Sequence, residues 1–447
     1  MGDMSEATRV AVPYAEPASL PGSVTVPKAG LVDTLSIILN VFLPTIAKGV
    51  IIRRPGVLAL ADWLDLDRRA VRAMQRLRSE YGSGPVLLRV FGRSLAVVLD
   101  PRDVHRILAE SPDPFATDTP EKASALAHFE PRGVLISRGS ERVDRRRFNE
   151  QVLEAGRPVH RLGQEFLRVV ESEAAGLRRH VRGQSNTLDW ASFSDAWFRM
   201  VRRIIFGDRA RNDHELSMLL AKLRSRANWA FLLPQRSRMR EQLLTSIRAY
   251  LARPAPNSLT AVMADIPVSG DTAPEHQVPQ RLFAFDAAGI TTYRSLALLA
   301  SHGCGTNESF LRATVLESLR LWPTSPLILR ETTAPTIWAN GVIPTHTGVV
   351  IFTPFFHRDD ERLPFANTFS PRLWIDGATQ HANLALIPFS EGPAVCPGRN
   401  LVLLLATSML SQLISGADPV LVSGKRLVPG RPLPATLDHY RLRFELR

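Results

Sequence analysis

The residue with the clearest capacity for chemistry is Cys396, in the loop Pro388–Asn400 (PFSEGPAVCPGRN). Gly392 lies four residues before it and Gly398 two residues after it, and glycine lets a backbone approach a flat group closely. The apolar segment that follows predicts a helix whose N-terminus favours the thiolate over the thiol. Such a thiolate suits axial ligation of haem iron. An isolated cysteine is more often a small buried apolar side chain, which is our interpretation of Cys304.

The loop from Phe389 to Gly398 has the spacing Phe-x-x-Gly-x-x-x-Cys-x-Gly, which is similar to that of a known protein family. It resembles the haem-binding loop of the cytochrome P450 family, the thiolate-ligated monooxygenases. The resemblance implies that Cys396 ligates the iron of haem b, in a loop shaped by Phe389 and both glycines, Gly392 and Gly398. Ala394 departs from the pattern, because the family usually has Arg or His there to bind a haem propionate.

Upstream, Glu317 and Arg320 are three residues apart in FLRATVLESLRLWP, so they lie on one face of a predicted helix and can form an ion pair. By itself an E-x-x-R pair is ordinarily a solvated surface pair. Its place before the cysteine loop resembles the family's buried Glu–Arg pair, which braces that loop. The family's third member is an Arg in Pro-x-Arg-aromatic; here Leu373 holds that position, and Arg372, one position earlier, is the predicted substitute.

A second motif lies in residues 281–300, a segment so apolar that it predicts a helix buried on nearly every face. The stretch Ala288–Thr292 (AGITT) resembles the family's Ala-Gly-x-Asp/Glu-Thr oxygen-binding motif. The resemblance implies that Ala288 and Gly289 form a groove for oxygen, with a helix kink at the glycine, and that Thr292 guides proton delivery. Without the cysteine loop, close helix packing would be the simpler interpretation.

Thr291 departs from that motif, since the family usually has an acid there. A hydroxyl does not titrate near neutral pH, so Thr291 passes protons only as part of a water chain. Water, groups on the substrate and Asp286 are the other candidate proton sources, although Asp286 is off the helical face of Thr292.

Three arginines are candidate partners for the two haem propionates, because a guanidinium binds a carboxylate in a fork. Arg330 matches a common propionate arginine of the family. Arg142 and Arg146 stand where the family has Trp or His and then Arg. We expect Arg146 to be the main partner of the pair and Arg142 to compensate for Ala394; the alternative is a solvated basic face.

The elements that position these residues are mostly helical. We expect a helix over 63–81, a hairpin over 86–99, a largely helical body over 156–253, a connector over 254–279 and a final hairpin near 434–446. The pattern predicts an α-rich fold with a minor β region. The resemblance implies the triangular cytochrome P450 fold, with haem between the buried helix and the cysteine loop. We expect one such domain over 31–447, after a loosely ordered leader over 1–30.

Composition narrows the partners and the compartment. The 447 residues carry a net charge of +12 and only two cysteines, which excludes a disulfide framework and paired-cysteine zinc sites. The N-terminus lacks the basic region of a signal peptide, so we expect a cytoplasmic protein. Residues 31–52 are apolar but interrupted by polar residues, which predicts a buried or interfacial segment. Arg53 and Arg54 follow it and could meet lipid phosphates, so we expect a membrane contact that is at most peripheral. No nucleic-acid recognition motif occurs.

The resemblance implies a monooxygenase that inserts one oxygen atom from O2 into an apolar small molecule, by hydroxylation or epoxidation. Electrons would come from a separate ferredoxin or flavodoxin-like protein with its reductase, and the basic charge suits an acidic donor. Substrate contacts are expected from 113–136, from 325–329 and from the 156–253 helices, including Trp229 and Phe231. Two alternatives stay open: a haem-thiolate peroxygenase, isomerase or coupling enzyme, and a haem-binding sensor without turnover.

Overall fold

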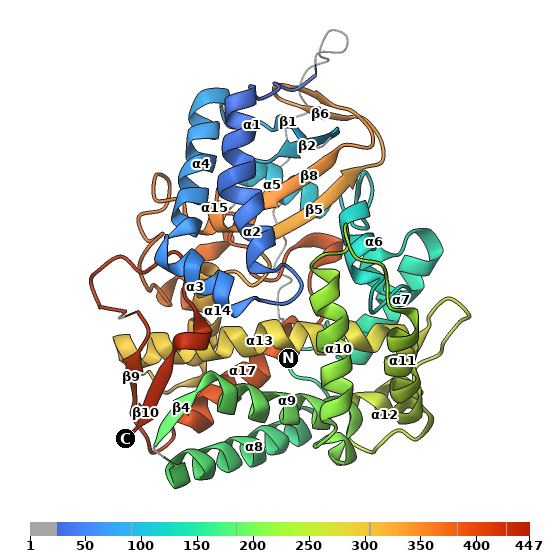
Figure 1. Cartoon of the computed structure of the whole chain (residues 1–447), viewed down its shortest axis with the longest axis vertical. Coiled ribbons are helices and arrows are strands. Elements are labelled where there is room, and N and C mark those ends of the chain that lie inside the picture. Colours follow the sequence, from blue (N-terminus) through green and yellow to red (C-terminus); the bar gives the residue numbers. More distant parts are fainter. Residues whose placement is uncertain (1–24, 91, 185, 304, 382, 426) are drawn as a thin grey trace, which may run out of the picture.

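The computed structural model describes residues 25–447, apart from 91, 185, 304, 382 and 426, so Cys304 lies outside the described residues. Helices form most of the chain and surround a small sheet region (Figure 1). The helices are α1 (Leu31–Ile37), the π-helical turn η1 (Ile38–Phe42), α2 (Leu43–Lys48), α3 (Pro55–Trp63), α4 (Leu66–Tyr81), α5 (Pro101–Ala109), α6 (Pro120–Leu126), α7 (Gly139–Leu153), α8 (Gly163–Gln184), α9 (Trp190–Phe206), α10 (His214–Ala227), α11 (Ser237–Ala252), α12 (Leu259–Ala264), α13 (Pro274–His302), α14 (Glu308–Leu321), α15 (Thr353–Arg358), α16 (Arg372–Ile375) and α17 (Arg399–Ile414). The predicted α-rich fold with a minor β region is confirmed.

The strands form three sheets. They are β1 (Val86–Val90), β2 (Arg93–Val97), β3 (Phe115–Ala116), β4 (Thr187–Asp189), β5 (Leu327–Thr332), β6 (Thr336–Trp338), β7 (Gly341–Ile343), β8 (Gly348–Phe352), β9 (Pro419–Ser423) and β10 (Arg443–Leu446). The largest sheet has the order β1-β2-β8-β5-β3, and in it β2 and β8 run parallel. The predicted hairpin at 86–99 is present as β1–β2. The predicted hairpin near 434–446 is wrong, because β10 pairs with β9 and β4 instead.

The end of the predicted leader is packed against this sheet. Val26 is fully buried, and its N–H donates to the carbonyl of Val342 at 3.2 Å. The N–H of Ala29 donates to the carbonyl of Leu87 at 2.9 Å. Residues 25–30 are therefore part of the folded unit, which corrects the boundary we expected at residue 31. The rest of the leader, residues 1–24, lies outside the described residues.

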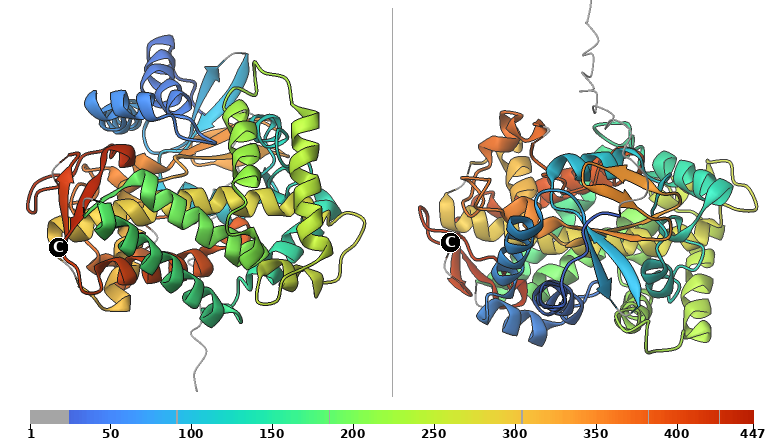
Figure 2. Two further views of the ribbon diagram at one scale, coloured as in Figure 1. Left: turned by 60° about the horizontal axis from the view of Figure 1, so that its bottom comes forward. Right: turned by 90° about the horizontal axis from the view of Figure 1, so that it is seen from above.

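The helical body is built around α13, which runs through the middle of the molecule with α9 and α17 beside it (Figures 1 and 2). Aromatic rings fill the space between α9 and α13: Phe193 stacks on Trp197 with centroids 5.9 Å apart, and Tyr293 lies 4.9 Å from Phe193. Part of the connector expected over 254–279 is helical, because α12 and the first turns of α13 fall inside it. The helices and the sheet have separate apolar cores.

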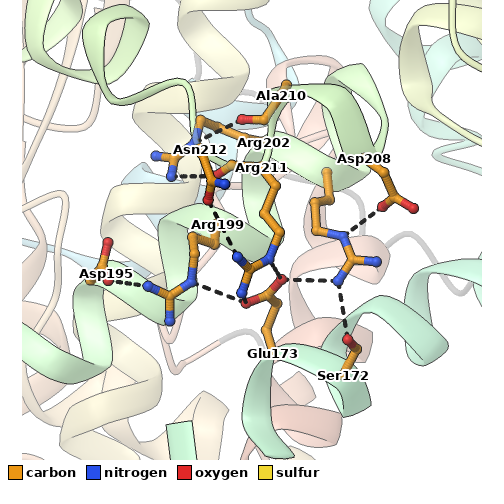
Figure 3. A network of polar contacts seen from close by, with 10 residues as sticks. Ser172, Glu173, Asp195, Arg199, Arg202, Asp208, Ala210, Arg211 and Asn212 are labelled. Carbon is orange, nitrogen blue, oxygen red and sulfur yellow. Dashed lines mark hydrogen bonds and ion pairs between the residues drawn. The ribbon is translucent and has the colours of Figure 1, made fainter. Parts of the chain in front are cut away.

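A charged network at the edge of the body ties α8 to α9 and to the turn that follows α9 (Figure 3). The carboxylate of Glu173 is only 1% exposed and accepts hydrogen bonds from Arg199, Arg203 and Arg211 at 2.7–3.1 Å. These bonds hold the pKa of Glu173 below its usual value despite burial, which by itself raises it. This cluster holds α8, α9 and the following turn together, and none of its residues belongs to the cysteine loop.

Candidate functional site

Cys396 lies in a tight loop immediately before α17. The N–H of Cys396 donates to the carbonyl of Phe389 at 2.9 Å, and the N–H of Val395 donates to the carbonyl of Gly392 at 3.0 Å. These two bonds join the ends of the predicted haem-binding loop. Gly398 is the N-cap of α17, so the thiol faces the positive end of a helix, as the sequence predicts.

The protonation of the thiol is a balance of opposing effects. Burial raises the pKa of Cys396 above its usual value, and this is the largest effect. Several effects lower the pKa and so favour the thiolate. They include the hydrogen bonds from the N–H groups of Gly398 and Arg399 and the charge of Arg146. The helix terminus favours the thiolate, as predicted, but burial outweighs it, so the terminus does not by itself produce a thiolate. A metal ion that binds a thiol deprotonates it outright.

Gly392 is held against α5 so closely that no other residue fits. Its φ is +65°, and a Cβ there would lie 2.2 Å from the carbonyl oxygen of Leu108. Nearby, Nδ1 of His105 is 2.6 Å from Glu391 Oε2, and Nε2 of His105 is 3.0 Å from the carbonyl of Leu384. The sequence prediction missed His105, whose ring connects α5 to the cysteine loop.

The Glu317–Arg320 pair is completely buried, with both side chains 0% exposed. Arg320 donates through Nη2 to Glu317 Oε1 at 2.6 Å and through Nε to Oε2 at 2.8 Å. It also donates to the carbonyls of His357, Ala366 and Thr368 at 2.8–3.1 Å. One buried cation thus joins α14 to the end of α15 and to the segment before α16, as a structural brace.

The third member of this cluster is Trp374. Its Nε1 donates to Glu317 Oε2 at 2.8 Å, and the N–H of Ser370 donates to Oε1 at 2.7 Å. Arg372 is exposed, and no hydrogen bond or ion pair joins it to Glu317. The predicted substitution by Arg372 is therefore wrong: in α16 the indole, two residues further on, turns inward and the guanidinium outward.

On α13, the two threonines of the predicted oxygen-binding motif are buried and bonded within the helix. Thr292 is 0% exposed and donates to the carbonyl of Ala288 at 2.8 Å, while Thr291 is 2% exposed and donates to the carbonyl of Ala287 at 2.9 Å. Because i and i+4 share a face, Ala288 and Thr292 lie together. Their roles in oxygen binding and proton delivery stay predictions.

Gly289 has a different neighbour from the one we expected. A Cβ at this position would lie 2.9 Å from Cδ1 and Nε1 of Trp197 on α9. The indole is anchored there, since its Nε1 donates to the carbonyl of Phe285 at 2.8 Å. The glycine allows α9 and α13 to approach closely, so the structure gives it a packing role, and its part in an oxygen groove stays a prediction.

Asp286, the alternative proton source, is engaged elsewhere. Its Oδ2 accepts from Arg224 Nη2 on α10 at 2.6 Å. Arg224 also donates to the carbonyl of Ile51 at 2.7 Å. The carboxylate thus joins α13 to α10, away from the face that carries Thr292.

Three cations, two of them buried and one half-buried, gather on α6, α7 and β5. They are Lys122, Arg142 and Arg330, and the charges of Arg142 and Arg330 act on Lys122 and on each other. Burial, followed by these like charges, lowers the pKa of Lys122 well below its usual value and that of Arg330 to about 10. None of the three forms an ion pair with a described residue. Lys122 was missed at the sequence level because a single lysine in PEKASAL has no spacing signal.

Arg146 is not part of this cluster in the way we predicted. Its Nη2 donates to the carbonyl of Val395 at 2.7 Å, and its Nε donates to Glu150 Oε1. The guanidinium therefore holds the backbone of the cysteine loop, and Arg142, only 8% exposed, takes the inner position. Because Arg146 is engaged in these two contacts, we now expect Arg142 to be the main propionate partner of the two.

These residues fit a haem. An unpaired group of cations in a low-dielectric interior is costly unless an anion neutralises it, and a haem carries two propionates. The cysteine at the start of α17 supplies one sulfur ligand, and no group of three or more His, Cys, Asp or Glu side chains that could hold a bare metal ion occurs among the residues described. Cys396 would hold the iron, and Lys122, Arg142 and Arg330 would hold the propionates.

Comparison with known proteins gives the same assignment. The sequence model of the family "Cytochrome P450" matches residues 306–416. Cytochrome P450 4c21 of Blattella germanica is 33% identical over 109 residues, which are 24% of this chain and 22% of that protein. The mitochondrial 1,25-dihydroxyvitamin D(3) 24-hydroxylase of Mus musculus is 27% identical over 136 residues, 29% of this chain and 26% of the relative. The matched part thus spans about a quarter of the length of these curated relatives.

The fold extends the likeness to nearly the whole described chain. The retinoic acid-bound cyanobacterial CYP120A1 superposes with a TM-score of 0.66 and 19% identity, over 83% of this chain and 93% of that one. The chain thus has the cytochrome P450 fold, and its residues 306–416 match the sequence model of that family.

Proposed function

We propose that this protein is a haem b monooxygenase that inserts one oxygen atom from O2 into an apolar small molecule. The observation that carries the proposal is the constellation itself: a thiol at the start of α17, the buried Thr292 on α13, and three clustered cations, Lys122, Arg142 and Arg330, that form no ion pair within the described part of the chain. When bound, a thiolate-ligated haem supplies the capacity to activate O2 by pushing electron density toward the O–O bond.

The chain's own residues then have defined tasks. Cys396 would hold the haem iron, and the amides of Gly398 and Arg399 would stabilise the charge of its thiolate. Lys122, Arg142 and Arg330 orient the cofactor through its propionates. The hydroxyl of Thr292, which donates to the carbonyl of Ala288 in this structure, would hold a water and hand a proton across it. With Thr291 hydroxylic and Asp286 paired to Arg224, the proton starts from water.

The substrate is an apolar molecule. On α13, Phe283, Ala284 and Ala287 are partly exposed and carry no charge. Among proteins of the same fold, CYP120A1 is described as bound to retinoic acid and P450BioI as bound to an acyl carrier protein ligated with hexadecenoic acid. Both are long apolar molecules with a polar end, and we extend that class to this chain.

Electrons come from a separate acidic ferredoxin or flavodoxin-like protein with its reductase, in the cytoplasm. Arg399 is exposed at the cysteine end of α17, and the chain has a net charge of +12. Oppositely charged surfaces accelerate the association of two proteins. The charge balance thus supports an acidic donor, and nucleic acid is not a partner.

The test is the absorption spectrum of the reduced carbon monoxide complex, for the wild type and for Cys396→Ser. We expect a long-wavelength Soret band in the wild type that is lost in the variant; its absence from the wild type would refute thiolate ligation. Thr292→Ala is expected to bind haem normally but to consume O2 without forming the same amount of product.

A second candidate is a haem-thiolate peroxygenase, which Thr291 in place of an acid favours, because a peroxide already carries the protons that the chain does not supply from a carboxyl group. Turnover with peroxide, together with none from O2, donor and reductase, would select it. A haem-binding sensor without turnover is selected if apolar ligands bind and neither oxidant gives a product.

A further inference from the structure

A small cavity lies where the first helices of the fold meet its middle (Figure 1). Its wall is formed by residues of α2–α4, of α13, of α14 and α15 with their flanking turns, and of the segment 435–437 before β10. The volume of the cavity is about 40 Å³. A water molecule needs about 10–15 Å³ of such space. The cavity therefore has room for a few water-sized atoms and none for an organic substrate.

Four cationic side chains line this cavity, and we call them the cation cage: Lys48, Arg53, Arg294 and Arg358. Lys48, Arg294 and Arg358 are 6, 5 and 4% exposed, and Arg53 is half-buried. Among the residues described, Asp67 is the only acidic side chain of the wall, and it forms an ion pair with Lys48. Three guanidinium groups therefore share the cavity without a carboxylate of their own.

The hydrogen bonds of the three arginines go to neutral oxygens. Arg53 donates to the carbonyls of Gly49 and Thr324, Arg294 to those of Trp322 and Leu437, and Arg358 to the amide oxygen of Asn367 and to three backbone carbonyls. No ion pair joins any of the three to the described part of the chain. Burial is the largest effect on their pKa values: it lowers that of Arg53, that of Arg294 to about 10 and that of Arg358 to about 9. Buried charges of one sign are costly unless a charge of the other sign compensates them.

Carboxylates outside the wall do not supply this compensation. Three of them act on the arginines of the cage, and each has another partner: Asp286 pairs with Arg224, Glu317 with Arg320 and Asp438 with Arg441. The cation cage thus keeps an excess of positive charge.

One donor of the cage also lacks an acceptor. Nε of Arg294 is buried and has no hydrogen-bond partner within the described ranges. The two Nη atoms of the same guanidinium donate to the carbonyls of Trp322 and Leu437 at 3.3 and 2.7 Å, and both of these residues belong to the cavity wall. The guanidinium is therefore fixed at the wall with one N–H left to donate.

We propose that the cation cage is a binding site for one small inorganic anion, chloride, between the first helices and α13. The charge of the ion compensates the unpaired guanidinium groups, and a spherical ion accepts N–H donors such as Arg294 Nε from any direction. Organic acids and phosphate are too large for a cavity of about 40 Å³. The wall joins segments that lie far apart in the chain, from Lys48 to Leu437, so the bound anion stabilises the folded state.

The direct experiment is a crystal of the wild-type holoprotein grown in sodium bromide, because bromide replaces chloride and scatters X-rays anomalously. We expect an anomalous difference peak in the cavity, within hydrogen-bond distance of Arg294 Nε. The absence of a peak from the cavity overturns the proposal, and this result does not depend on whether any variant folds.

The solution experiment is thermal unfolding of the holoprotein, followed by circular dichroism, in mixtures of sodium chloride and sodium gluconate at one total concentration. The ionic strength is then constant, and gluconate is too large for the cavity. A ligand that binds only the folded state stabilises it by mass action, so the melting temperature of the wild type should rise by about 1–2 °C for each tenfold increase in chloride.

Two variants locate this effect. Arg294→Met should lose the dependence on chloride. Arg281→Met is the matched control, because Arg281 is a buried arginine of the same helix, 3% exposed, that bonds to Asn149 and is not part of the cavity wall; it should respond to chloride like the wild type. The proposal is overturned if the wild type shows no dependence on chloride, or if Arg281→Met loses it as Arg294→Met does. It is also overturned if Arg294→Met keeps the dependence, because a bromide peak would then mark an adventitious ion only.

Discussion

Replacing Trp374 by phenylalanine tests the buried cluster that braces the cysteine loop. The indole donates to Glu317 Oε2 at 2.8 Å, and Glu317 accepts three further hydrogen bonds, two from Arg320 and one from the backbone of Ser370. Phenylalanine keeps most of the ring and removes only the N–H. The matched control is Arg372→Ala, which changes the exposed residue that the sequence pattern favours for the same role.

The size of the effect follows from the charge and burial of the acceptor. A hydrogen bond to an ionised group contributes about 1.5–3 kcal/mol to stability, and the smaller ring adds up to about 1 kcal/mol through lost packing. We therefore expect Trp374→Phe to lower the free energy of unfolding by about 2–4 kcal/mol. Arg372→Ala should change it by less than about 0.5 kcal/mol, as is usual for an exposed side chain.

A double-mutant cycle separates the hydrogen bond from the packing. Glu317→Gln leaves Arg320 buried without a counter-charge, which costs about 3–5 kcal/mol. In that background the indole N–H meets a neutral amide, so Trp374→Phe should cost about 1 kcal/mol less than in the wild type. The measurement is denaturant unfolding of the holoprotein followed by circular dichroism and by the Soret band. Equal effects of Arg372→Ala and Trp374→Phe would refute the assignment of the indole to this cluster.

Three further predictions concern the other contacts of the site. Gly289→Ala should destabilise the protein by about 1–2 kcal/mol, because overpacking against the anchored Trp197 outweighs the better helix propensity of alanine; unchanged thermal unfolding would contradict the close contact. The hydrogen bond that His105 donates to Glu391 raises the pKa of His105, so its stabilisation is present at low pH and lost as pH rises through that raised value. The free energy of unfolding of the wild type should therefore exceed that of His105→Gln more at about pH 6 than at about pH 8, by at most about 1 kcal/mol, and a pH-independent difference would exclude this ion pair. Lys122→Met should speed the transfer of haem to an acceptor protein about tenfold by removing one charge from the propionate site, and an unchanged rate would remove Lys122 from that site.

Where function depends on a short local spacing, the sequence was a reliable guide. Cys396 with its glycines, and Glu317 with Arg320, are adjacent in the chain, so the elements that hold them were predictable and the structure brings them where expected. The helices were also predictable, because an apolar period of 3.6 residues can be recognised within a few turns of the chain.

The sequence could not decide which of two neighbouring side chains turns inward. The choice between Arg372 and Trp374, and the choice between Arg142 and Arg146, depend on which groups face each helix. Those groups come from distant parts of the chain. Lys122 joins the cation cluster for the same reason. A buried carboxylate or carbonyl selects the donor that reaches it, and no spacing rule contains that information.

The sequence by itself predicted an α-rich fold from its apolar periodicity, a cysteine ligand from the spacing around Cys396, and a basic protein from its net charge of +12. Only the tertiary structure decided that Gly289 serves the packing of α9 on α13, and that the apolar segment after residue 30 leaves one face outside the fold. The physical reason is common to both: a side chain's role is set by what lies within a few ångströms of it, and most of those atoms belong to residues far away in the sequence.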